Sequence, residues 1–165
     1  MFNRVGKLGD HKKNALLGLG LLALCWLSYG FTIGKMGYFL DDWYIVWTYR
    51  VFGTAGFAEF FSGDRPLLGF IYRIFIPIYK DSVIGWQLFA LFTKWISAIT
   101  LWALLKMLLP KQKWLSYAVA SLFVVYPGFR FHYFSIMYSQ VYVLLSIYIL
   151  SYILMVLAIR NPNKR

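Results

Sequence analysis

Acidic residues and cysteine are scarce in this chain. Only six of its 165 residues are Asp or Glu, against 17 Lys and Arg, and charged residues of both signs make up 14%. So little charge is not typical of a soluble domain. The one cysteine, Cys25, lies within an apolar run, so the chain forms no intrachain disulfide and gives no sign of its redox compartment.

Apolar residues dominate instead. Hydrophobic residues account for 61% of the chain and aromatic residues for 21%, against roughly 45–50% apolar residues in a soluble domain. This composition predicts an integral membrane protein, with the lipid bilayer as its first partner. A net charge of +11 could indicate nucleic-acid binding, but the basic residues cluster at the ends of apolar segments, as membrane topology requires. No nucleic acid is expected as a partner.

The apolar runs predict an all-α membrane protein, a single transmembrane domain over residues 1–165 with about four transmembrane helices. The spans are expected at about 15–34, 84–105, 114–127 and 141–159. The first is predicted to be retained, because it is longer than the apolar core of a signal peptide and no small-residue cleavage site follows it. Residues 35–81 form the predicted outer loop and carry five of the six acids.

Within that loop, Pro66–Ile78 is apolar but only 13 residues long, too short to cross about 30 Å of hydrocarbon. We predict a juxtamembrane helix there, with Pro66 in its first turn and Asp64 as its N-cap. Four spans then place ten basic residues, in the N-terminal arm, the 106–113 turn and the tail, on one side. The positive-inside rule makes that side cytoplasmic. A crossing Pro66–Ile78 would break the rule at two of the three clusters.

Asp41 and Asp42 are the most informative residues, because they are adjacent, flanked by aromatics, and expected at the outer membrane surface. One interpretation makes the pair a solvated N-cap for a helix that starts at Trp43. The other makes one of them a general base, because two neighbouring carboxylates near a low-dielectric region do not both ionise easily. The residues alone leave both interpretations open.

Four basic or titratable residues are candidate phosphate ligands on the same side. Arg65 is either half of a local ion pair or a phosphate clamp, and Lys94, inside a span, either snorkels or awaits a lipid phosphate. Arg130 and His132 lie in an aromatic segment, residues 130–140, predicted as an outer loop. They are either solvent-exposed or serve as a phosphate contact and a proton relay.

The order of these features resembles the N-terminal part of the glycosyltransferase C superfamily, which includes protein O-mannosyltransferases and lipid A aminoarabinose transferases. The matching stretches are Leu40-Asp41-Asp42-Trp43, Asp64-Arg65-Pro66-Leu67, Tyr126-Pro127-Gly128 and Ser139-Gln140-Val141-Tyr142. The resemblance implies a polyprenyl-phosphate sugar donor and sugar transfer at the extracytoplasmic face of a bacterial-type plasma membrane. By motif position Asp41 is the better match to the catalytic aspartate and Asp42 the second.

The chain also departs from this superfamily. Ser139-Gln140 stands where its members often have a second acid, so no metal and no cofactor is expected. Its members are usually much longer, so we expect a membrane partner or further C-terminal helices to complete the site. A rival hypothesis, that of a small non-catalytic four-span carrier, flippase or accessory subunit for lipid-linked sugars, explains the length without them.

Overall fold

The computed structural model describes residues 2–126 and 134–160, with side chains from His11 onward, and every regular element in these ranges is helical. The predicted all-α class is therefore confirmed. The elements are α1 Phe2–Tyr29, the 3₁₀ turn η1 Gly30–Thr32, α2 Asp41–Phe52, α3 Gly56–Phe60, α4 Pro66–Tyr79, α5 Val83–Leu108, α6 Lys113–Val125 and α7 Ser135–Arg160.

Three helical segments are long and apolar enough to cross a membrane: His11–Thr32, Val83–Leu108 and Ser135–Arg160. They coincide with three of the predicted spans, as expected for an integral membrane protein. The fourth predicted span, 114–127, overlaps α6, which has 13 residues and reaches only about 20 Å at 1.5 Å per residue. That this segment crosses the membrane stays a prediction.

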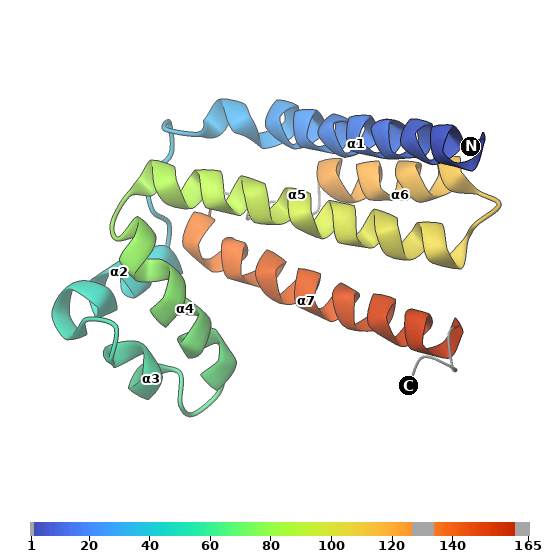
Figure 1. Cartoon of the computed structure of the whole chain (residues 1–165). Coiled ribbons are helices and arrows are strands. Elements are labelled where there is room, and N and C mark those ends of the chain that lie inside the picture. Colours follow the sequence, from blue (N-terminus) through green and yellow to red (C-terminus); the bar gives the residue numbers. More distant parts are fainter. Residues whose placement is uncertain (1, 127–133, 161–165) are drawn as a thin grey trace.

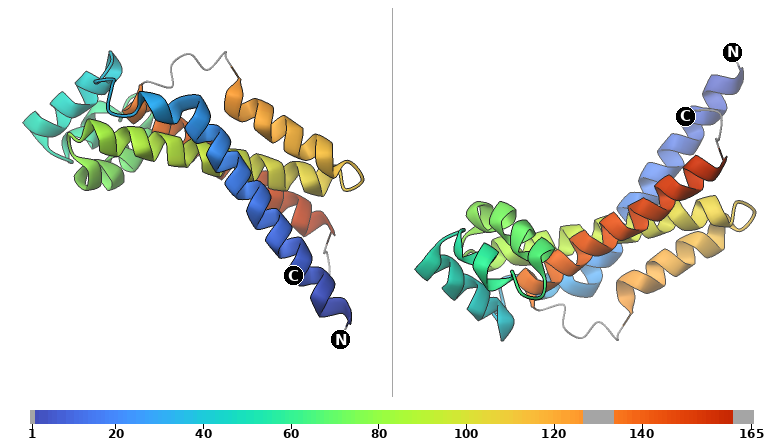
Figure 2. Two further views of the ribbon diagram at one scale, coloured as in Figure 1. Left: turned by 90° about the horizontal axis from the view of Figure 1, so that it is seen from above. Right: turned by 90° about the horizontal axis from the view of Figure 1, so that it is seen from below.

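The long helices form a bundle around α5, which contacts α1, α6 and α7. Figure 1 shows α2, α3 and α4 gathered beside one end of this bundle, and α5 and α7 running in the same direction. Hydrogen bonds fix the opposite end, where Arg160 Nη2 donates to the Met107 carbonyl oxygen at 2.6 Å and Lys106 Nζ donates to Asn14 Oδ1 at 2.9 Å. Toward that end α1 and α7 diverge from α5 and α6 (Figure 2).

Each part of the molecule has its own apolar core. One core lies among α1, α5 and α6 and includes Leu21, Cys25, Trp102 and Val124. The other ties α2, α3 and α4 to the beginnings of α5 and α7. Buried aromatic residues dominate it, which predicts a rigid unit rather than a loose loop. Its buried members are Ile45, Val46, Phe57, Phe61, Tyr72, Ile76, Trp86, Phe89 and Ile136.

The close contact between α3 and α4 depends on Gly69. A Cβ atom at this position would lie 2.6 Å from the Phe57 carbonyl oxygen and 2.9 Å from Phe61 Cβ. Neither atom is the end of a flexible side chain, so only glycine fits without a shift of the backbone. Gly69 thereby sets the distance between two of the helices that contribute to the candidate site.

Three local predictions need correction. The helix α4 does begin at Pro66, but its N-cap residue is Arg65 and Asp64 makes no capping bond; Asp64 accepts from Arg65 instead. The helix α2 begins at Asp41 rather than Trp43, after Leu40, whose φ of 39° places the bend in the chain there. Residues 135–140 are not a loop, because α7 begins at Ser135.

Candidate functional site

The two adjacent aspartates have opposite environments. Asp42 is fully buried, with 0% of its surface exposed, whereas Asp41 is exposed and lines a pocket. Both lie in the first turn of α2, where successive side chains point about 100° apart. One therefore faces the start of α7 and the other faces the pocket.

Asp42 caps α7, a helix distant from it in sequence. Its Oδ1 accepts a hydrogen bond from the Met137 backbone N–H at 3.0 Å, and the backbone N–H groups of Ile136 and Ser135 also stabilise the carboxylate. Burial opposes them and prevails, raising the pKa of Asp42 to about 6. The carboxylate thus occupies the N-terminal position that a helix offers to an anion and fastens α2 to α7.

The pocket beside Asp41, here called the Asp41 pocket, has a volume of about 190 Å³. Its walls come from α2, α3, α4 and the first turn of α7, so the cluster at the end of the bundle builds it together with a membrane-length helix. Polar groups and aromatic rings both line it. The lining residues are Asp41, Tyr44, Ile45, Phe60, Phe61, Arg65, Leu68, Tyr72 and Met137.

Arg65 places a permanent positive charge in the Asp41 pocket. Its Nε donates to Asp64 Oδ2 at 2.8 Å, and this bond, with a smaller contribution from Asp41, raises the pKa of the guanidinium. The side chain is 59% exposed, so the ion pair holds its position more than it stabilises the fold. Within the described residues this is the one hydrogen bond of the Arg65 side chain, which leaves its terminal N–H groups for an anion.

Tyr72 adds a neutral hydroxyl. The ring is 1% exposed, and burial, reinforced by the negative charge of Asp42, raises the pKa of its phenol above the usual range. The phenol therefore keeps its proton at neutral pH. At the rim, the rings of Tyr44 and Phe60 lie 4.7 Å apart between centroids and are partly exposed, a surface on which the apolar face of a sugar can stack.

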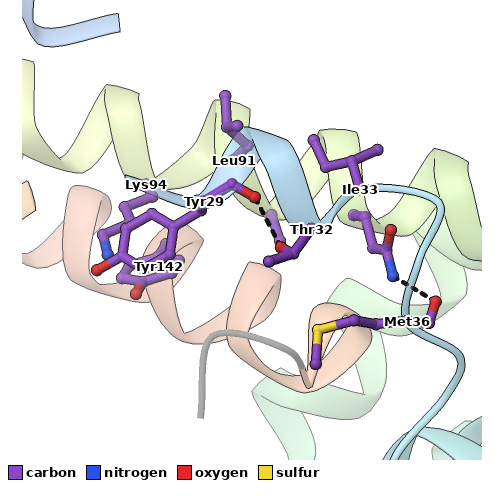
Figure 3. Close-up of a pocket in the computed structure, with 9 residues that line it drawn as sticks. Tyr29, Thr32, Ile33, Met36, Leu91, Lys94 and Tyr142 are labelled. Atoms are coloured by element: carbon purple, nitrogen blue, oxygen red, sulfur yellow. Dashed lines mark hydrogen bonds between the residues drawn. The ribbon is translucent and has the colours of Figure 1, made fainter. Parts of the chain in front are cut away.

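Lys94 lies elsewhere, in a pocket between α1, α5 and α7 (Figure 3). It is only 2% exposed, and its Nζ lies 3.5 Å from the centroid of the Tyr29 ring and 5.7 Å from that of Tyr142. These distances are typical of cation–π contacts. The pocket holds about 30 Å³, room for one water. Lys94 and Arg65 line different pockets, so the structure does not bring them together, and the phosphate-binding role of Lys94 stays a prediction.

Two candidate residues, Arg130 and His132, lie outside the described residues. Ser139 and Gln140 are fully buried in α7 and do not line the Asp41 pocket. Sequence reasoning missed Tyr72 and Met137, which line it from α4 and α7. The Asp-Asp motif marks the place, but no local pattern shows which distant residues fold against it.

No group of three or more His, Cys, Asp or Glu side chains suited to a metal ion occurs in the part of the chain that the structure describes. What the pocket offers is a carboxylate able to accept a proton, a guanidinium able to bind a phosphate, and aromatic walls. Comparison with known proteins found no matching family model, no matching curated protein and no matching solved structure.

Proposed function

We propose that the chain is a membrane glycosyltransferase-type module. It would transfer a sugar from a polyprenyl-phosphate-linked donor to an acceptor at the extracytoplasmic face, with Asp41 as the general base. The observation that carries the proposal is the split of the aspartate pair: Asp42 is engaged in capping α7, while Asp41 is exposed beside Arg65 in one pocket. Because the two aspartates have different environments, Asp41 is favoured over Asp42 as the base.

The chemistry needs one base and one cation. The acceptor hydroxyl oxygen forms a bond to C1 of the sugar while the bond between C1 and the phosphate oxygen breaks, with inversion at C1. Asp41 takes the hydroxyl proton, and the electron pair of the broken bond stays on the polyprenyl phosphate. Arg65 stabilises the charge that develops on this phosphate, which needs no proton at neutral pH. The Tyr72 hydroxyl can donate to a sugar or phosphate oxygen.

A four-span topology with both termini in the cytoplasm belongs to the same proposal. Its support is the direction of the helices: α5 and α7 run the same way, so the chain must return along the bundle between Leu108 and Ser135 (Figure 1). α6 runs in the direction of that return. The 106–113 turn and the end of α7 then lie on one side, with α2–α4 on the other.

Labelling of single cysteines in a Cys25→Ser background tests this topology. Gly63 and Gln112 are exposed, and the space around Gly63 is open, so Gly63→Cys and Gln112→Cys disturb little. An impermeant thiol reagent should modify Gly63→Cys in intact cells and Gln112→Cys only after lysis. The reverse pattern would reject both the topology and an extracytoplasmic site.

The base assignment is tested by Asp41→Asn, which keeps the volume but accepts no proton. Transfer from a panel of polyprenyl-phosphate sugars, in membranes from cells that produce the chain, should fall by on the order of 10²–10⁴. Glu59→Gln is the matched control, because Glu59 is an exposed acid on α3 that does not line the Asp41 pocket. Equal rates for parent and Asp41→Asn would show that Asp41 is not the base.

A non-catalytic carrier or accessory subunit for lipid-linked sugars is the second candidate. The observation that favours it is the size of the Asp41 pocket, about 190 Å³, which suits a phosphate or part of a sugar rather than donor and acceptor together. A carrier should bind the donor through Arg65 and be indifferent to Asp41→Asn. Donor binding without transfer, lost in Arg65→Gln and kept in Asp41→Asn, would decide for the carrier.

A further inference from the structure

A second charged pocket lies at the opposite end of the bundle from Asp41. It holds about 170 Å³, room for a tetrahedral anion and a few waters at about 30 Å³ per water. Three helices build it, and each contributes one lysine. The lining residues are Lys13, Asn14 and Leu17 of α1, Trp102 and Lys106 of α5, and Lys113 of α6.

Lys106 is the fixed member of this set. Its Nζ donates to Asn14 Oδ1 at 2.9 Å and lies 4.6 Å from the ring centroid of Trp102, which is itself buried. Neither partner carries a negative charge, so the ammonium is held in place without being neutralised. Lys13 and Lys113 are exposed and reach the same pocket from the other two helices.

Three lysines line this one pocket, and the described residues supply no carboxylate beside them. Five of the six acids have described side chains, and all five lie between residues 41 and 81, in the part of the chain that forms the other end of the bundle. The helix α6 adds a partial positive charge, since it begins at Lys113 and Gln112 makes no capping bond there. An external anion is the partner that this arrangement fits.

We propose that this pocket binds the phosphate of an anionic phospholipid headgroup. Lysines at the ends of apolar helices, on the side that carries the basic clusters, are the typical setting for such headgroups. Leu17 and Trp102 line the same pocket and give the glycerol and upper acyl chain an apolar surface. A soluble phosphate would use the lysines but gain nothing from these two residues, which is why the lipid is favoured.

Native mass spectrometry of the full chain, extracted with phosphatidylglycerol or phosphatidylcholine, tests the proposal. The parent should retain phosphatidylglycerol and exchange phosphatidylcholine freely. Lys106→Gln and Lys113→Gln should each weaken phosphatidylglycerol retention about five-fold, from a contribution of about 1 kcal/mol per basic residue near an anionic surface. Lys12→Gln and Lys111→Gln are matched controls: they remove the same charge from exposed positions nearby that do not line the pocket.

Two further arms separate the sources of the anion and the effect on folding. In phosphatidylcholine, added phosphatidylglycerol should raise the melting temperature of the protein, whereas added inorganic phosphate should not. Equal increases with the two additions would overturn the lipid assignment. Lys106→Arg keeps the charge, so recovery of retention in that variant shows that Lys106→Gln lost binding rather than its fold. An equal loss of retention in all four glutamine variants would mean diffuse attraction to the lipid surface, and would reject a built site.

Discussion

Charge is used differently at the two ends of the helical bundle. At the end formed with α2–α4, three of the five described acids have partners within the chain: Asp42 caps α7, Asp64 pairs with Arg65, and Asp81 pairs with Arg50. At the other end three lysines line one pocket, and no described carboxylate joins them. At the end that includes α2–α4, here called the acidic end, most of the described acids pair within the chain. At the end with the three lysines, here called the basic end, the proposed partner is an external anion.

This difference separates residues that hold the fold from residues that await a ligand. A substitution at Asp42, which is buried and caps α7, should change the stability of the protein, whereas a substitution at Asp41 should change activity. A substitution at Lys13 or Lys113 should leave stability in detergent nearly unchanged, within about 0.5 kcal/mol for an exposed site. The following predictions test the acidic half of the comparison, from the largest expected effect to the smallest.

The pH dependence of stability should carry the signature of Asp42. Burial raises its pKa to about 6, so between about pH 4 and pH 6 the folded protein keeps a proton that the unfolded chain has released. The free energy of unfolding should therefore fall as the pH rises through this window, by on the order of 3 kcal/mol, and then level off. Thermal unfolding in detergent from pH 4 to pH 8 measures this slope. Asp42→Asn should remove it, and an unchanged slope in that variant would exclude Asp42 as its source.

Gly69→Ala should destabilise the α3–α4 contact that forms the Asp41 pocket. The added Cβ would meet the Phe57 carbonyl oxygen at 2.6 Å, and overpacking against backbone costs about 1–3 kcal/mol. Gly63→Ala is the matched control, since no heavy atom lies within 4 Å of a Cβ there. Chemical denaturation of both variants makes the comparison, and equal midpoints would show that α3 and α4 are not packed as closely as described.

The sequence predicted the parts of the fold that depend on local pattern. Apolar runs of 18 or more residues fixed the three membrane-length helices, and the proline with its short apolar run located α4. The sequence also predicted Asp41 and Arg65 on the same side of the membrane, and in the structure both line one pocket. In each case a neighbouring stretch of chain contains the information.

Long-range contacts could not be predicted in this way. Asp42 caps a helix 95 residues further along the chain, and Lys94 meets Tyr29 from a different helix. Both aspartates had the same neighbours in sequence, so only the packing of α2 against α7 could distinguish the buried one from the exposed one. The lysines of the basic pocket were predicted as a topology signal, but their convergence around Trp102 depends on three helices.

A comparison of Asp42→Asn with Asp42→Ala isolates the contribution of the α7 cap to stability. Both variants are uncharged at position 42, so the difference between them is free of the burial cost of the carboxylate. Asn can still accept the Met137 N–H, whereas Ala cannot, and loss of an N-cap acceptor costs about 0.5–2 kcal/mol. Asp42→Ala should therefore unfold at lower denaturant than Asp42→Asn at every pH. Coincident unfolding curves would mean that α7 does not depend on this contact.

The smallest effect should come from Arg50 and Asp81, the pair that joins the end of α2 to the turn before α5. Arg50 Nη2 lies 2.5 Å from Asp81 Oδ2, but the side chains are 64% and 49% exposed. Arg50 lowers the pKa of Asp81, yet an exposed pair contributes little to stability, because water and salt screen it and ordering two side chains costs entropy. A double-mutant cycle with Arg50→Gln and Asp81→Asn should give a small coupling energy, below the effects expected at Asp42 and Gly69. The coupling should shrink between low salt and 1 M salt, where the Debye length falls to about 3 Å.

Lys12→Gln, at the basic end, should show no coupling with Asp81→Asn. A coupling that survives high salt would mean that the pair is shielded from water in the membrane-embedded protein, and that the acidic end is more enclosed than its exposed surface indicates.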